Sequence, residues 1–137
     1  MPSEKAAAQG PAKGILLCID DALPILEVLT DLLEKYGYSV LTSPSVGHGL
    51  TLFETTDVDV VILDHEMPEM SGYEVALAMK RIKPAVPIIM HSGAIEIPEK
   101  TLQVVDAIVP KGGDLQLLIS KVAGIMAASR AQPSQSL

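Results

Sequence analysis

Residues 58–72 read VDVVILDHEMPEMSG, and this stretch decides the fold. Its first six residues are nearly all Val, Ile and Leu, a pattern typical of a strand in a parallel sheet that is covered on both faces. A short polar loop follows, and a helical pattern begins at Gly72. The stretch therefore predicts a strand, a loop and a helix, with Asp64 as the first residue after the strand.

The same unit recurs on both sides of this stretch. Apolar runs predict strands at 15–19, 38–42, 58–63, 86–90 and 107–109, and helical patterns lie at 22–36, 45–54, 72–82, about 102–104 and 114–128. Regular alternation of strands and helices predicts an α/β fold with a parallel sheet and helices on both faces. We expect one domain at 14–128, with flexible tails at 1–13 and 129–137 that are rich in Ala, Ser, Pro and Gln.

The composition narrows the class of function. The chain has 137 residues and a formal net charge of -7, which disfavours nucleic-acid binding because that depends on Lys and Arg neutralising phosphates. No apolar run approaches the ~20 residues that span a bilayer, and no signal-peptide pattern is present. The single cysteine, Cys18, lies in an apolar run and is interpreted as a core residue. These features predict a cytoplasmic protein without membrane insertion or direct nucleic-acid binding.

Polar residues stand where four of the predicted strands end. Ligands of open parallel sheets bind beyond the carboxyl ends of the strands, so these residues are candidates for one site. They are Asp20 and Asp21 after the first strand, Asp64 after the third, Ser92 after the fourth and Lys111 after the fifth. Crowded carboxylates stay ionised only beside a cation, or else one of them takes up a proton. Mg²⁺ is the expected cation, because it prefers oxygen ligands and commonly binds carboxylates together with phosphate oxygens.

These side chains suit the transfer of a phosphoryl group. A carboxylate can act as a nucleophile and form an aspartyl phosphate, and Asp64 is placed for this at the sheet edge. Lys111 would supply positive charge and Ser92 a hydrogen-bond donor, and alignment with charge neutralisation is most of what the reaction needs. Each residue alone also has a plain structural interpretation, such as an acidic pair at a helix N-terminus for Asp20 and Asp21. Their joint placement favours a site.

The block Asp64-x-x-Met-Pro-x-Met-x-Gly72 and the acidic pair before it resemble the receiver domain of bacterial two-component response regulators. The resemblance covers about residues 14–128. It implies a flavodoxin-like fold with five parallel strands in the order 2-1-3-4-5. Only 18 residues separate Ser92 from Lys111, fewer than is usual in the family, so the fourth helix is expected to be short or distorted.

The resemblance also implies how a metal ion is held. Asp21 and Asp64 would ligate Mg²⁺ directly, together with the backbone carbonyl of Glu66. Asp20 would act mainly through a bound water molecule.

Asp64 would take its phosphoryl group from a sensor histidine kinase or a phosphotransfer protein. Lys111 would pair with the phosphoryl oxygens, and Ser92 would move toward them. The expected protein is a stand-alone receiver, a signalling domain and no enzyme beyond its own phosphorylation and dephosphorylation. It would act on a downstream protein target or in a phosphorelay.

The sequence also departs from the family pattern, which leaves alternatives open. Ile108 stands where an aromatic residue is common, and Gly112 stands where a proline usually follows the lysine. These changes motivate a second hypothesis, a receiver-like protein-interaction module that phosphorylation does not control. A phosphatase of the haloacid dehalogenase type ranks low, because position 66 holds Glu where that family has an acid/base Asp. A flavin or nucleotide carrier also ranks low, because no glycine-rich phosphate loop follows the first strand.

Overall fold

The computed structural model describes residues 13–93 and 96–130, and these form an alternating series of strands and helices. In chain order the elements are β1 (Ile15–Ile19), α2 (Leu23–Lys35), β2 (Ser39–Ser43), α3 (Val46–Thr55), β3 (Val60–Asp64), α4 (Gly72–Ile82), β4 (Ile88–Ser92), α5 (Glu99–Leu102), β5 (Ala107–Pro110) and α6 (Leu115–Arg130). The predicted series of elements is therefore confirmed, with shifts of one to a few residues at the ends.

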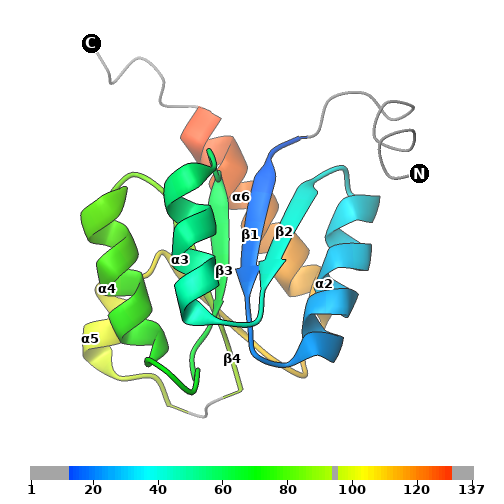
Figure 1. Ribbon diagram of the computed structural model, residues 1–137. Helices are drawn as coiled ribbons and strands as arrows, with labels where there is room; N and C mark the ends of the chain where they lie inside the picture. The colour runs from blue at the N-terminus through cyan, green and yellow to red at the C-terminus, as the bar shows by residue number, and fades with distance from the viewer. Residues whose placement is uncertain (1–12, 94–95, 131–137) are drawn as a thin grey trace.

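The strands form one parallel sheet in the order β2-β1-β3-β4-β5. This confirms the expected flavodoxin-like topology. The register brings the ends of neighbouring strands level, since Ile19 pairs with Leu63, Asp64 with His91, and Ser92 with Pro110. All the carboxyl ends consequently meet at one edge of the sheet, the lower edge in Figure 1.

Helices cover both faces of the sheet (Figure 1). The core on one face joins the strands to α2 and α6, and the core on the other face joins them to α3 and α4. Alternate residues of each central strand enter opposite cores, which is why β3 and β4 are buried along their whole length. The uninterrupted apolar runs in the sequence reflect this burial on both sides.

Four strands, β2 to β5, end one or two residues further toward the site edge than predicted. The shift is largest for the fourth strand, which is predicted at 86–90, whereas β4 begins at Ile88 and ends at Ser92. Pro87 has no N–H for a ladder, and Val86 donates instead to the carbonyl of Lys83 in a turn. Asp64 and Ser92 are therefore the last residues of their strands rather than the first residues after them.

The fourth helix of the fold, α5, has only four residues, as the short spacing before Lys111 indicated. It begins directly after Pro98, which the sequence placed near its start, and ends at Leu102, so only the first residue of the predicted range 102–104 belongs to it. The last helix, α6, runs to Arg130, two residues beyond the predicted end. Residues 1–12 and 131–137 lie outside the described residues, so the two tails remain a prediction. No helix within 13–93 or 96–130 is long and apolar enough to cross a membrane.

Candidate functional site

Three carboxylates meet at the carboxyl edge of the sheet. Asp20 and Asp21 follow β1 directly, and Asp64 ends the neighbouring strand β3. One oxygen from each lies within 4.8 Å of the others. Asp20 and Asp64 are buried, with 2% and 5% of their surface exposed, whereas Asp21 is open to solvent. The structure thus brings together the acidic residues that the sequence predicted as a cluster.

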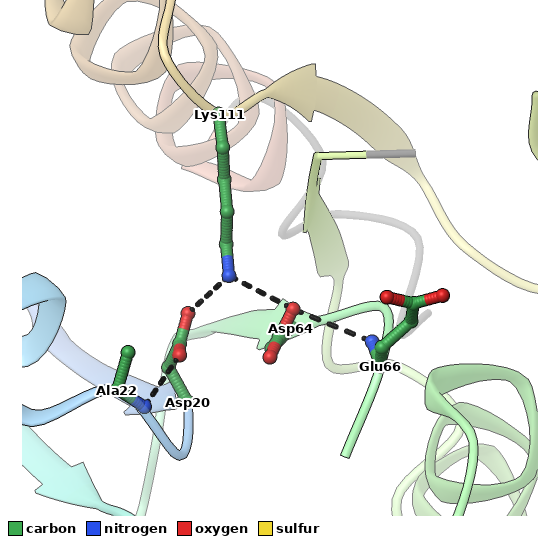
Figure 2. Close-up of polar contacts among 5 residues, drawn as sticks. All are labelled: Asp20, Ala22, Asp64, Glu66 and Lys111. Atoms are coloured by element: carbon green, nitrogen blue, oxygen red, sulfur yellow. Dashed lines mark hydrogen bonds and ion pairs between the residues drawn. The ribbon is translucent and has the colours of Figure 1, made fainter. Parts of the chain in front are cut away.

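Backbone N–H groups hold two of these side chains in place (Figure 2). An oxygen of Asp20 accepts the N–H of Ala22 at 2.9 Å, just before α2 begins. An oxygen of Asp64 accepts the N–H of Glu66 at 3.3 Å. Each carboxylate is therefore fixed by the loop that follows its own strand.

Lys111 reaches both buried carboxylates from the end of β5. Its Nζ lies 2.8 Å from an oxygen of Asp20 and 3.0 Å from Oδ1 of Asp64 (Figure 2). Its backbone N–H donates to the carbonyl of Ser92 at 2.7 Å, which extends the strand ladder by one residue. Gly112 follows with φ +79°, a conformation that glycine adopts readily, and so lets the chain turn away toward α6.

The charges perturb one another because they are shielded from water. Burial raises the pKa of Asp64 above its ordinary value and the charge of Asp20 raises it further, while the hydrogen bond from Lys111 opposes them. Burial alone would lower the pKa of Lys111, but its bonds to Asp20 and Asp64 raise it overall. Lys111 is therefore a firmly charged cation within an excess of negative charge.

The loop after Asp64 is held by its two ends. Gly72, the first residue of α4, donates its N–H to the carbonyl of His65 at 2.8 Å. A β-carbon on Gly72 would lie 2.8 Å from the backbone oxygen of Asp64, so only glycine permits this approach. A capping box between Ser71 and Glu74 then starts α4. These contacts explain why glycine and a helix start follow the acidic residue at this spacing.

A pocket of about 460 Å³ opens above the carboxylates. Asp21, Asp64, Ser92 and Lys111 line it, together with the loop residues 65–68. Ser92 is buried at the end of β4. Every residue predicted for the site thus lines this pocket except Asp20, which lies beneath Lys111 and contacts it directly.

His91, the neighbour of Ser92 in β4, is a buried histidine at this edge. It is 4% exposed, and burial together with the charge of Lys111 lowers its pKa, so the ring is neutral at pH 7. Its Nδ1 has no hydrogen-bond partner among the described residues.

Ile108, at the position where the family often has an aromatic residue, is half-buried and packs into the core that includes α3 and α4.

Sequence reasoning missed three residues beside the site. Tyr73 on α4 and Lys100 on α5 make a cation–π contact, with Nζ 4.5 Å from the ring centroid, and Thr101 is fully buried next to them. No pattern in the sequence marked them, because their proximity depends on where the short α5 packs against α4.

The donor atoms at this edge suit a hard divalent cation. The cluster offers carboxylate oxygens within reach of one another, and residues 65–68 of the loop after Asp64 line the same pocket. Mg²⁺ prefers such oxygen ligands and is commonly held by one or two carboxylates. The residues present therefore fit a magnesium ion.

The fold and the site agree with the comparisons to known proteins. The chain matches the response regulator receiver domain family over residues 16–123. The response regulator TrrA of Thermotoga maritima, whose structure is a complex with Mg(2+)-BeF, is 30% identical, with a TM-score of 0.78 over 82% of this chain and 98% of that one. A receiver domain protein from Clostridium thermocellum is 28% identical, with a TM-score of 0.80 over 86% and 98% of the two chains.

Curated relatives are longer proteins. The transcriptional regulatory protein GlrR of Escherichia coli is 34% identical over 61% of this chain and 19% of its own length. The response regulator SaeR of Staphylococcus aureus is 36% identical over 54% and 32%. The match thus spans about a fifth to a third of these regulators. This chain belongs to the response regulator receiver domain family of two-component systems.

Proposed function

We propose that this receiver accepts a phosphoryl group on Asp64 from the phosphohistidine of a sensor histidine kinase or a phosphotransfer protein. The observation that carries the proposal is the position of Asp64. Its carboxylate lies in the pocket at the sheet edge, 3.0 Å from the ammonium of Lys111 and beside the carboxylates of Asp20 and Asp21. This is an anionic nucleophile with a fixed cation next to it.

The transfer needs no base on the protein. An ionised oxygen of Asp64 forms a bond to phosphorus while the bond from phosphorus to the donor histidine nitrogen breaks. The nitrogen keeps the electron pair and takes up a proton from solvent. Lys111 favours ionised Asp64 and pairs with the phosphoryl oxygens, and the hydroxyl of Ser92 moves toward them after transfer.

Asp21, Asp64 and the backbone carbonyl of Glu66 would hold Mg²⁺, with Asp20 acting through water. The ion would neutralise charge on the phosphoryl oxygens. The clustered carboxylates support this assignment, and so does the Mg(2+)-BeF complex of the related TrrA.

The output would be protein contact or phosphorelay. The acidic balance of the chain supports this, because it disfavours direct contact with nucleic acid. We expect the receiver to lie in the cytoplasm and to have no enzymatic turnover of other substrates. Immunoblotting of fractionated native cells, which gives the compartment of the protein, tests the first part of this expectation.

Labelling by acetyl phosphate tests the phosphoacceptor assignment. We expect one phosphoryl group per chain by intact mass spectrometry in the presence of Mg²⁺, and none with EDTA. Asp64→Asn should abolish labelling, whereas Asp57→Asn, an exposed aspartate before β3, should leave it unchanged. Absence of labelling in the folded wild-type protein would instead favour the interaction module that phosphorylation does not control.

A further inference from the structure

A second groove lies on the far side of the loop that follows Asp64. It has a volume of about 540 Å³, within the ~300–1,000 Å³ of known ligand sites. Its walls are the loop residues 65–71, the first turn of α4 and the short helix α5. In Figure 1, α5 lies beside the lower end of α4, close to this loop. The pocket lined by Asp21, Asp64, Ser92 and Lys111, which we call the phosphoacceptor pocket, does not include residues of α4 or α5. The groove is therefore a separate feature.

Two polar atoms at this groove lack partners within the described part of the chain. Thr101 lines the groove and is fully buried, yet its hydroxyl makes no hydrogen bond. Nδ1 of His65, a residue that lines both this groove and the pocket of Asp64, is also buried without a partner. Buried polar groups in folded proteins are nearly always paired, so each such atom calls for an explanation. A ligand that supplies hydrogen bonds here would provide one.

The groove is also acidic. Glu66 and Glu69 line it, and their exposed carboxylates have no ion pair or hydrogen bond among the described residues. Lys100 lines it as well, but its ammonium already lies over the ring of Tyr73. A positively charged ligand would therefore be favoured over a negatively charged one.

The remaining wall is apolar and adaptable. Met67, Met70, Pro68 and Pro98 line the groove. Unbranched methionine side chains adjust to different apolar partners, and for this reason they are common at surfaces that bind peptides. An apolar floor with an acidic rim fits a peptide that carries a basic side chain next to an apolar one.

We propose that this groove docks a segment of a partner protein that presents Arg or Lys beside an apolar side chain. The basic group would lie against Glu66 and Glu69, the apolar group against the two methionines, and a backbone amide would pair with Thr101. Docking does not depend on the proposed phosphorylation. The groove and the phosphoacceptor pocket nevertheless share residues 65–68 as a common wall. If Asp64 is phosphorylated, the two events would influence each other reciprocally, and this second step rests on the proposed function.

Titration with two designed peptides tests the docking. The probes are acetyl-Ala-Leu-Arg-Leu-Ala-amide and the same peptide with Glu in place of Arg, followed by amide chemical shifts of the full chain. We expect the Arg peptide to shift amides in 65–74 and 98–102, and the Glu peptide to leave them unchanged. Asp64→Asn should bind the Arg peptide like wild type, so a failure of phosphorylation would not affect this result.

Two charge reversals, one inside the groove and one outside it, form a test variant and its matched control. Glu69→Lys should weaken binding of the Arg peptide by about fivefold or more, because like charges then face each other. Glu54→Lys, on the exposed side of α3, changes net charge equally and should leave the affinity unchanged. Thr101→Val keeps the shape of the side chain and should also weaken binding. The proposal would be overturned by shifts on another face, by equal binding of both peptides, or by equal weakening in the two charge reversals.

Discussion

At the scale of single residues, Asp64 is a carboxylate that the fold makes costly to ionise. Its pKa is raised, so the native state binds more protons than the unfolded state between the unfolded and folded pKa values. The free energy of unfolding of the metal-free protein therefore falls as the pH rises through this window. A neutral side chain of the same shape should remove the penalty.

Asp64→Asn should consequently be more stable than wild type in EDTA at pH 7.5, and the difference should shrink as the pH is lowered toward 4. Urea unfolding at both pH values measures it. Wild type should recover part of the difference on addition of Mg²⁺, since an ion bound only by the native state stabilises that state. If the Asn variant were less stable at pH 7.5, the ion pair of Asp64 with Lys111 would stabilise the protein more than the burial of the Asp64 charge destabilises it.

Cys18 provides a second prediction at this scale. Burial, with the nearby charge of Asp20, raises the pKa of its thiol to about 12. The thiolate is the reactive form, so native protein at pH 8 should not react with iodoacetamide, whereas protein in urea should react fully. Mass spectrometry distinguishes the two. Rapid alkylation of native protein would mean that β1 opens readily.

At the scale of elements, the loop between β3 and α4 depends on Gly72. A β-carbon there would meet the backbone of Asp64 and His65 at 2.8–2.9 Å. Gly72→Ala should destabilise the protein by about 1–3 kcal/mol, the usual cost of overpacking, and should slow labelling by acetyl phosphate because the loop must move. Gly124→Ala, in α6 with open space around it, should instead stabilise by about 0.5–1 kcal/mol and label normally. Equal effects of the two changes would refute the close approach.

The elements also show how far the sequence could predict this structure. Long apolar runs and helical patterns identified each strand and helix, because burial on both faces leaves a strong signal. The ends of β4 were misplaced by two residues, since Pro87 delays the ladder and His91 and Ser92 continue it. Polar residues at the edge of a sheet still take part in pairing, and hydrophobicity does not reveal this.

At the scale of the whole molecule, two cores share one sheet. Leu29 belongs to the core beside α2 and α6, and Phe53 to the core beside α3 and α4. Both side chains are buried almost completely. Leu29→Ala should destabilise by about 2–5 kcal/mol and Phe53→Ala by about 3–5 kcal/mol. Because the sheet joins the cores, each variant should unfold in one transition. Far-UV circular dichroism and hydrogen exchange, which report on different parts of the structure, should therefore give the same free energy of unfolding. Two separate transitions would mean that the faces unfold independently.

The site was predictable at this scale because parallel strands place their carboxyl ends at one edge. Placing each of Asp20, Asp21, Asp64 and Lys111 after the end of a predicted strand was enough to bring them together, without knowledge of the strand order. The groove beside α5 was not predictable in this way. It depends on the packing of a four-residue helix against α4, and Thr101, Lys100 and Tyr73 are ordinary residues until that packing is known.

Lys111 already bridges the two buried carboxylates before any other cation arrives. A divalent ion in the proposed magnesium site would therefore compete with a positive charge that belongs to the chain itself. Its apparent affinity would reflect the difference between its own attraction to the carboxylates and that of the Lys111 ammonium. Lys111 thus offsets part of the negative charge of the acidic edge with a cation that the chain itself supplies.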